Sequence, residues 1–158
     1  MDEQAKKTAL RMIPYGLYVL GVGKGERSTV STVNWLTQAS FQPPLVVVGV
    51  KRDTLTYDLL KEHGAFAVSV LGTGQKDVAF AFFRHVEPEG GKFGAYEYET
   101  AVTGAPILKV APAWFECRLT DTLERGDHAI VVGEVVEAGV REQTKALTME
   151  ECGVTYGG

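Results

Sequence analysis

The chain has 158 residues, 45% of them hydrophobic, which is enough for one well-packed domain and too few for two. We therefore expect a single domain over residues 1–158. The formal net charge is −4, and the 16 Lys and Arg residues are scattered, so nucleic-acid binding is disfavoured. Residues 1–7 lack the apolar core of a signal peptide, and no apolar run approaches the roughly 18 residues of a membrane span. We expect a cytoplasmic protein without membrane contact.

Cysteine and histidine are too sparse for a disulfide framework or a metal centre. Cys117 and Cys152 stand far apart without a nearby ligand set, and His63, His85 and His128 lack metal-ligand spacing. The sequence also lacks the nucleophile-elbow, zinc-protease and Walker motifs. We therefore expect neither a metal site nor hydrolase chemistry.

The predicted elements begin with a short amphipathic helix over residues 2–10 and a β-hairpin with strands at 15–22 and 28–33. Further strands are expected at 45–50, 65–71, 114–122 and 127–136, and helices at 54–63 and 76–84. Gly64 suits a helix C-cap. Residues 92–104 are expected to be irregular, and the polar segment 138–158 to be a peripheral tail.

The balance of these elements predicts the fold class. Strands outnumber helices and follow one another closely, which leaves little room for long parallel crossovers. The expected fold is therefore mainly β, an antiparallel barrel with two or three peripheral helices.

The stretch from residue 28 to residue 56 carries the strongest chemical signal. Residues 28–40 are rich in hydroxyl and amide side chains, which suits a surface that hydrogen-bonds a ligand. The β-branched run 45–50 is typical of a strand buried on both faces. It is followed by a basic, hydroxyl-bearing turn at the start of a predicted helix, where an anion binds well. This order suits a ligand with an amide-rich body and a phosphate tail.

Among the histidines, His128 is the most suggestive because it follows Gly126 and Asp127 at the start of a predicted strand. A ring nitrogen beside a carboxylate is a candidate proton donor. His63 falls at a predicted helix C-terminus, where a cation favours the dipole. His85 follows an aromatic helix and suits a pocket edge or a solvated loop equally well. Spacing alone leaves a purely structural role open for each of them.

Several of these motifs, in this order, resemble the flavin reductase family. They are residues 15–20, residues 32–34 leading to 40–45, the turn 51–56, and residues 64–70, 103–106, 126–128 and 132–135. The chain is most similar to the flavoredoxins and to the flavin reductase domain of high-molecular-weight rubredoxins. The resemblance implies a Greek-key split β-barrel that binds FMN, or alternatively FAD, at a homodimer interface, with NADH or NADPH as co-substrate.

The resemblance also assigns site residues. It implies that the flavin is bound by Thr32, Val33, Asn34, Trp35, Leu36, Ser40 and Phe83, and its phosphate by Lys51, Arg52, Thr54 and Thr56. His128 is the implied catalytic residue, on the nicotinamide side. Trp35 departs from the small Ser or Ala of many relatives, so either it narrows the pocket or its side chain points away.

The implied reaction transfers a hydride from NAD(P)H to flavin and electrons onward to free flavin, ferric iron or a redox protein. Flavin carries this chemistry itself, which agrees with the lack of a nucleophile or acid-base pair. The expected partner is a rubredoxin, a flavodiiron protein or a monooxygenase component on a separate chain. Two alternatives stay open: a non-enzymatic FMN electron-transfer protein, and a split-barrel protein that binds heme or a pyridoxal-type ligand.

Overall fold

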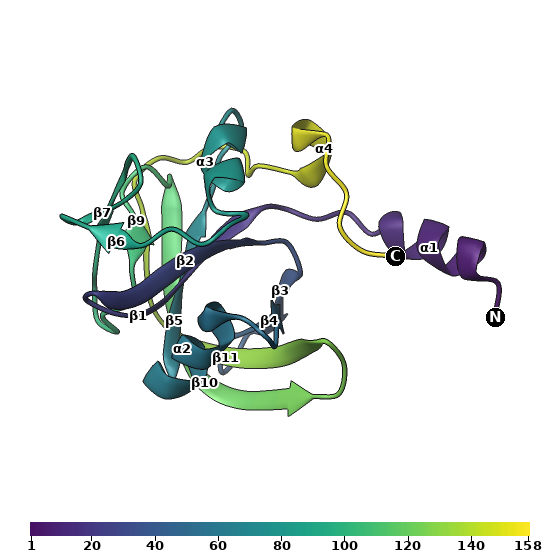
Figure 1. Ribbon diagram of the computed structural model, residues 1–158, viewed down its shortest axis with the longest axis horizontal. Helices are drawn as coiled ribbons and strands as arrows, with labels where there is room; N and C mark the ends of the chain where they lie inside the picture. The colour runs from purple at the N-terminus through teal and green to yellow at the C-terminus, as the bar shows by residue number, and fades with distance from the viewer.

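A seven-stranded antiparallel sheet dominates the structure, a computed structural model that describes residues 1–158 (Figure 1). In spatial order its strands are β2 (Arg27–Val33), β1 (Tyr18–Lys24), β5 (Ala65–Val70), β10 (Ala113–Glu124), β11 (His128–Val140), β4 (Leu45–Lys51) and β3 (Leu36–Ser40). A smaller sheet contains β6 (Pro88–Glu89), β7 (Lys92–Phe93), β8 (Tyr96–Glu99) and β9 (Ile107–Leu108). The helices are α1 (Glu3–Arg11), α2 (Leu55–His63), α3 (Lys76–Ala81) and α4 (Met149–Cys152).

The large sheet must curl because its two edges are tied together in sequence. Strands β2 and β3 lie at opposite ends of the sheet order, yet only Asn34 and Trp35 separate them in the chain. Three consecutive Cα–Cα steps span at most about 11 Å, so the edges must approach each other. The two edge strands are not paired with each other, and the result is the predicted mainly β split barrel.

Helix α2 fills the open side of the barrel, where it contacts β1, β2, β4 and β5. Its buried side chains include Tyr57, Leu59 and Leu60, which join the core formed by alternate residues of the strands. Each fully buried side chain of this kind contributes about 1.5–3 kcal/mol, so this face anchors the helix. Helix α1 is different, because it buries no residue and projects from the body of the molecule (Figure 1).

The predicted helix at 54–63 is confirmed, and local chemistry explains both ends. The Thr54 hydroxyl accepts a hydrogen bond from the Tyr57 N–H at the N-cap. Gly64 adopts a left-handed conformation at the C-cap, with φ of 69°, and its N–H bonds to the Leu60 carbonyl. Helix α3 is shorter than predicted, ending at Ala81 instead of Arg84. None of the helices is long and apolar enough to cross a membrane.

Strand β4 corrects the expectation of burial on both faces. Val46, Val48 and Val50 are buried in the barrel core, whereas Leu45, Val47 and Gly49 on the other face are only partly covered. The expectation that residues 92–104 are irregular was also wrong, because this segment contains the short strands β7 and β8.

The C-terminal segment is not the peripheral tail that its polarity predicts. Leu147 is fully buried and Met149 is 8% exposed, and both join a core cluster with Leu17. The backbone is tied down as well, since the Leu17 N–H donates to the Leu147 carbonyl and the Met149 N–H donates to the Tyr15 carbonyl. The prediction was wrong because two alternating apolar side chains are enough to dock an otherwise polar segment.

We predict that Gly133 in β11 is required by close packing inside the barrel. A Cβ atom there would lie 2.6 Å from the Phe66 ring and 2.7 Å from the Cβ of Cys117. Gly133→Ala should therefore lower the free energy of unfolding by about 1–3 kcal/mol, measured by urea denaturation. Gly126→Ala is the matched control, because no atom lies within 4 Å of the added Cβ. Equal midpoints for the two variants would contradict this packing.

Candidate functional site

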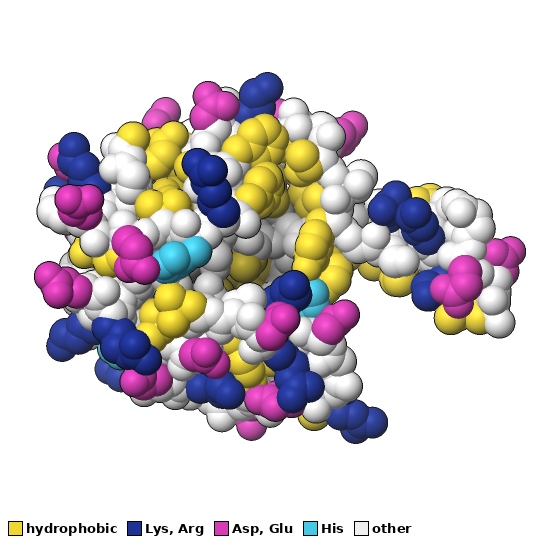
Figure 2. All heavy atoms as spheres, in the orientation of Figure 1, with side chains coloured by type: hydrophobic (Ala, Val, Ile, Leu, Met, Phe, Trp, Pro, Cys, Tyr) yellow, Lys and Arg dark blue, Asp and Glu magenta, His cyan; other side chains and the backbone are white.

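A cavity of about 540 Å³ opens where the two edges of the barrel meet, and Figure 2 shows a hollow bordered by hydrophobic side chains on this face of the molecule. Its walls come from Leu17, Ser31, Thr32, Val33, Asn34, Trp35, Gly49, Val50, Lys51, Thr54, Thr56, Phe82, Phe83, His128, Met149, Val154, Thr155 and Tyr156. They belong to the residue before β1, to β2, the two-residue link, β4, the start of α2, the residues just after α3, β11 and the C-terminal segment. Closure of the barrel thus brings six separate stretches of the sequence to one cavity.

Most of the residues proposed from the sequence come together here. The lining includes Thr32, Val33, Asn34, Trp35, Lys51, Thr54, Thr56, Phe83 and His128. Three proposed residues do not line the cavity. Leu36 packs against the barrel core, Ser40 lies at the far end of β3, and the Arg52 guanidinium bonds to the Glu124 carboxylate at 2.8 Å and to the Gly126 carbonyl at 3.1 Å.

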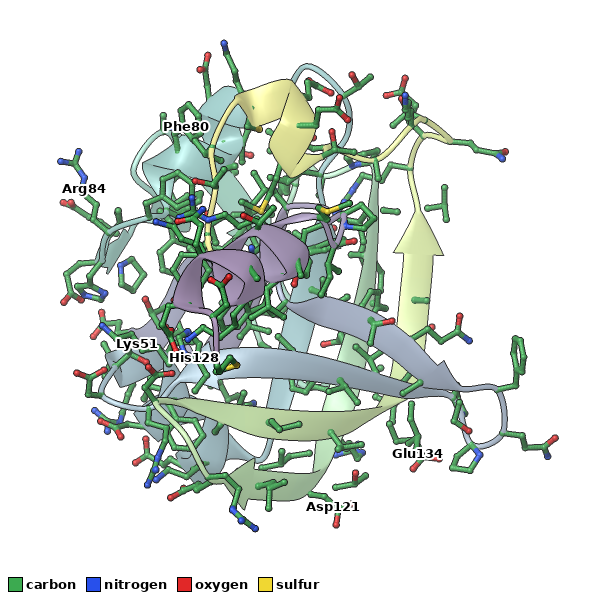
Figure 3. The ribbon with its side chains drawn as sticks, turned by 90° about the vertical axis from the view of Figure 1, so that its right-hand side faces the viewer. Lys51, Phe80, Arg84, Asp121, His128 and Glu134 are labelled. Carbon is green, nitrogen blue, oxygen red and sulfur yellow. The ribbon has the colours of Figure 1, made fainter.

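Lys51 and His128 are neighbours although 76 residues separate them in the chain. Strand pairing between β4 and β11 places their Cα atoms opposite each other, and both side chains lie on the same side of the molecule in Figure 3. The Lys51 ammonium has only a long contact, 3.8 Å, to Asp53. The cavity lining contains no Asp or Glu side chain, so in a chain of net charge −4 this is a locally cationic surface that suits an anion.

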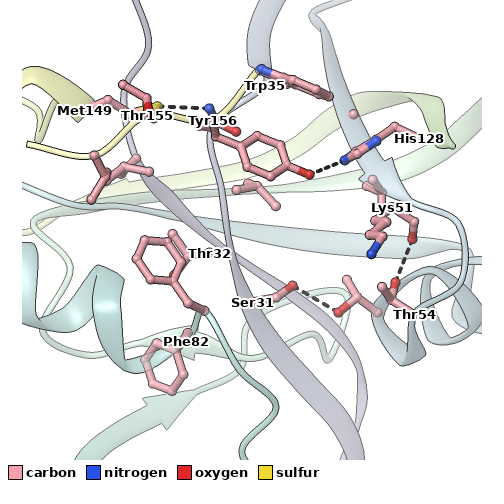
Figure 4. A pocket seen from close by; sticks show the side chains of 18 residues that line it. Ser31, Thr32, Trp35, Lys51, Thr54, Phe82, His128, Met149, Thr155 and Tyr156 are labelled. Atoms are coloured by element: carbon pink, nitrogen blue, oxygen red, sulfur yellow. Dashed lines mark hydrogen bonds between the residues drawn. The ribbon is translucent and has the colours of Figure 1, made fainter. Parts of the chain in front are cut away.

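Hydroxyl groups line the same end of the cavity as Lys51 (Figure 4). The Thr54 hydroxyl donates to the Lys51 carbonyl at 2.7 Å, and the Ser31 and Thr56 hydroxyls bond to each other at 3.0 Å. Thr54 also caps α2, whose first N–H groups have no partner within the helix. A cation, hydroxyls and a helix N-terminus therefore converge on one end of the cavity.

Three aromatic rings form a further wall next to Lys51. The Trp35 ring lies 4.7 Å from the His128 ring and 5.0 Å from the Tyr156 ring, centre to centre. His128 bonds through Nδ1 to the Asp127 carboxylate at 2.8 Å and through Nε2 to the Tyr156 hydroxyl at 2.7 Å. In the neutral imidazole, Nδ1–H donates to Asp127 and Nε2 accepts from Tyr156. Trp35 thus lines the cavity and does not point away.

These contacts affect the acidity of the groups around His128. The hydrogen bond from His128 lowers the pKa of Asp127. Burial, with the Asp127 charge, raises the pKa of Tyr156, so its hydroxyl stays protonated at neutral pH and donates to His128. On the far side of Lys51, burial and the bond to Glu124 raise the pKa of Tyr57 to about 12.

The other two histidines lie outside the cavity. His63 Nε2 bonds to the Thr103 carbonyl at 2.9 Å, while His85 bonds to Thr29 at 3.2 Å and to Glu87 at 2.8 Å. His128 is therefore the one histidine that faces the candidate site.

The match to a family model agrees with this arrangement. Residues 10–155 match the flavin reductase like domain. The chain belongs to this family. Its split-barrel fold is shared with a solved family structure, BorF, the flavin reductase component of a bacterial two-component tryptophan halogenase. The two share 31% sequence identity with a TM-score of 0.82, and the match covers 99% of this chain and 98% of that one.

Other relatives in the flavin reductase family differ more in length. An NADH-dependent FAD reductase of Streptomyces globisporus is 37% identical, with 79% of this chain and 69% of that protein covered. An NADH-dependent FMN reductase of Streptomyces nodosus is 33% identical, with 86% and 74% covered. The chain spans only 42% of a probable flavin reductase of Rhizobium meliloti and 24% of a diflavin flavoprotein of Synechocystis.

Sequence reasoning missed the part of this flavin reductase-like site that the C-terminal segment supplies. Met149, Val154, Thr155 and Tyr156 all line the cavity. The only signals in the sequence were an aromatic residue near the chain end and the alternation of Leu147 with Met149. Neither signal indicates which distant surface the segment covers.

Proposed function

We propose that this chain is a flavin reductase that binds FMN, or alternatively FAD, in the cavity and accepts electrons from NADH or NADPH. One observation carries the proposal. The cavity combines an aromatic wall with a cationic, hydroxyl-rich end and has no carboxylate in its lining. That polarity matches a ligand with a flat aromatic body and an anionic tail.

The residues present fit a flavin in size and chemistry. A volume of about 540 Å³ lies within the range of roughly 300–1,000 Å³ usual for cofactor sites. The walls offer flat apolar surface from Trp35 and Phe83 for the ring system. When bound, flavin accepts a hydride from reduced nicotinamide and thus supplies the redox chemistry, while the protein binds and orients it.

The phosphate end is assigned to Lys51, Thr54 and Thr56. The Lys51 ammonium supplies charge, and the first turn of α2 supplies backbone N–H groups and the partial positive charge of a helix N-terminus. The Thr54 hydroxyl accepts from the Tyr57 N–H and donates its one hydrogen to the Lys51 carbonyl, so it can donate to an anion, with its cap kept, only by turning that hydrogen away from Lys51. Arg52 is left out of the proposed site because its guanidinium is bonded to Glu124.

The polar edge of the ring is assigned to the end of β2 and the link that follows it. β2 is an edge strand, and Thr32 faces away from β1: its N–H donates to the Phe82 carbonyl at 3.0 Å and its hydroxyl to the Ala79 carbonyl at 2.6 Å, so its backbone C=O is the group proposed for the ring. The Asn34 amide is buried and donates to the Met149 sulfur at 2.9 Å, a weak acceptor that a better partner can replace. Leu36 and Ser40 lie outside the cavity and are also omitted.

His128 is proposed to position the nicotinamide. Its Nδ1 is held by Asp127, which fixes the ring orientation and leaves Nε2 directed toward the cavity and Tyr156. The residue acts through a hydrogen bond and needs no change of charge in the reaction.

The proposal for the final electron acceptor rests on the systems to which relatives of this chain belong. They include the reductase subunit of a stachydrine N-demethylase and the flavin reductase of a styrene monooxygenase. We propose that reduced flavin or its electrons pass to an oxygenase component or redox protein on another chain. Anaerobic titration of the FMN-loaded protein tests this against a purely electron-transferring flavoprotein. NADH or NADPH should bleach the visible flavin band, and a band stable to both would contradict a reductase.

Removing the Lys51 charge should weaken FMN selectively. A charge-assisted hydrogen bond contributes roughly 1.5–3 kcal/mol, so Lys51→Ala should raise the dissociation constant of FMN by about ten- to a hundredfold. Riboflavin, which lacks the phosphate, should bind almost unchanged, as measured by fluorescence quenching. Arg52→Ala is the matched control, because this neighbouring cation is turned to Glu124. Equal FMN affinity in both variants would place the phosphate elsewhere.

His128→Ala should slow flavin reduction without loss of the bound flavin. Losing one positioning hydrogen bond is expected to lower the reduction rate by about tenfold in anaerobic stopped-flow measurements. The visible spectrum of bound FMN should persist. The control is His63→Ala, because that ring bonds to the Thr103 carbonyl outside the cavity. A parental rate in His128→Ala with both nicotinamides would remove this residue from the site.

We also propose a homodimer with the flavin near the interface. The projecting helix α1 buries no side chain within the chain and carries exposed Leu10, Met12 and Ile13 at and just beyond its C-terminal end. Such an apolar stripe is typical of a surface that packs against another subunit. Light scattering of the FMN-loaded protein should give twice the chain mass of 17.1 kDa. A monomer with full FMN occupancy would disprove the dimeric site.

A further inference from the structure

The last residues of the chain enter the cavity from outside the barrel. After α4 the chain runs back across the opening, and Val154, Thr155 and Tyr156 line the cavity (Figure 4). We call residues 154–158 the C-terminal strap. The Tyr156 side chain points to His128, and its ring packs against Trp35. The proposed nicotinamide contact, His128 Nε2, is therefore already occupied by a residue of the same chain.

Few interactions hold the strap in place. Beside the Tyr156 hydrogen bond, the Arg11 side chain of α1 donates through Nε to the Gly157 carbonyl at 3.1 Å. Gly158 lies against Lys7 of the same helix. Tyr156 itself remains 48% exposed, so its ring is only partly enclosed. The strap is thus held by the Tyr156 contacts in the cavity, by partly buried Val154 packed against the core cluster of Leu17 and Met149, and by the hydrogen bond from α1.

The closed position also leaves one buried polar group unsatisfied. Trp35 Nε1 is shielded from solvent and has no hydrogen-bond partner. Gly157 covers it, since a Cβ on that glycine would lie 3.8 Å from Nε1. A buried N–H without a partner opposes the arrangement that buries it, and withdrawal of the strap would return this group to water. Two hydrogen bonds therefore favour the closed position of the strap, and the desolvated Trp35 N–H opposes it.

We infer that the C-terminal strap is a displaceable occupant of the nicotinamide half of the site, with Tyr156 competing for His128 Nε2 against the nicotinamide ring. The inference rests on the proposed function. The Tyr156 side chain and the nicotinamide both present a planar ring that bears a hydrogen-bonding group. Neither hydrogen bond of the strap involves Lys51, Thr54 or Thr56, so the strap regulates access of the reductant and not of the flavin phosphate.

The consequence for the reaction is a raised apparent KM for the electron donor. A ligand that binds only the open form has its dissociation constant divided by the fraction of open molecules. Anything that pulls α1 or the strap away would raise this fraction and speed reduction at low donor concentration. Because Arg11 of α1 is bonded to the strap, a movement of α1 can change the fraction of open molecules from outside the cavity.

The test compares two variants that release the strap by different routes. Tyr156→Ala removes the contact in the cavity, whereas Arg11→Ala removes the distant attachment and leaves every lining residue in place. Lys6→Ala is the matched control, because Lys6 also lies on α1 but pairs with Glu3. With FMN-loaded protein, each release variant should lower the KM for NADH by about three- to tenfold, the equivalent of one hydrogen bond. In Arg11→Ala, which changes no lining residue, the kcat and the FMN dissociation constant should stay near parental values.

A second readout follows the strap without flavin or nicotinamide. Proton NMR of the ligand-free protein resolves the indole N–H signals of Trp35 and Trp114, and Trp35→Phe assigns them. Exchange of the Trp35 N–H with water should be faster in both release variants than in the parent chain and in Lys6→Ala. An unchanged exchange rate in both release variants would overturn the inference that the strap is displaceable.

The two readouts separate the failure of this inference from that of the proposed function. Absence of FMN binding in every variant, with faster Trp35 exchange, would reject flavin reduction while it supports a movable strap. Normal flavin reduction with an unchanged KM in both release variants would reject competition. A lower kcat in Tyr156→Ala without a lower KM would also reject it, because Tyr156 would then position His128 for the reaction.

Discussion

The link of two residues between the two edges of the large sheet is the constraint on which the site depends. Asn34 and Trp35 are the whole connection between β2 and β3, which stand at opposite ends of the strand order. The barrel must therefore close at this point, and the link itself becomes part of the cavity wall. The Gly49 N–H bonds to the Trp35 carbonyl at 2.8 Å and holds the link against β4.

Closure of the barrel also determines which charged side chains line the cavity and which lie outside it. The register of β4 against β11 brings Lys51 beside His128 and leaves Arg52 to pair with Glu124 outside. Two adjacent cations thus have different surroundings, since successive residues near a strand end point in different directions. The cavity gains one cation and no carboxylate, a charge pattern that favours an anionic ligand in an acidic chain.

Much of this arrangement was predictable from local sequence. Strand patterns, the Thr54 and Gly64 caps and the polar character of residues 28–40 follow from neighbouring residues, and the ordered motifs indicated the family. The pairing of Lys51 with His128 was not predictable from spacing, because register between distant strands depends on the whole sheet. The strap was missed for a similar reason. Its few apolar residues show that it docks, but the surface it covers is set by tertiary structure.

The most direct measurement of the central claim is a crystal structure of the chain with FMN. The account predicts the phosphate beside the Lys51 ammonium and the first turn of α2, and the ring system between the β2 edge and the wall formed by Trp35 and His128. A flavin bound outside this cavity, for example in the surface hollow formed by Arg52, Tyr57 and Glu124, would contradict it.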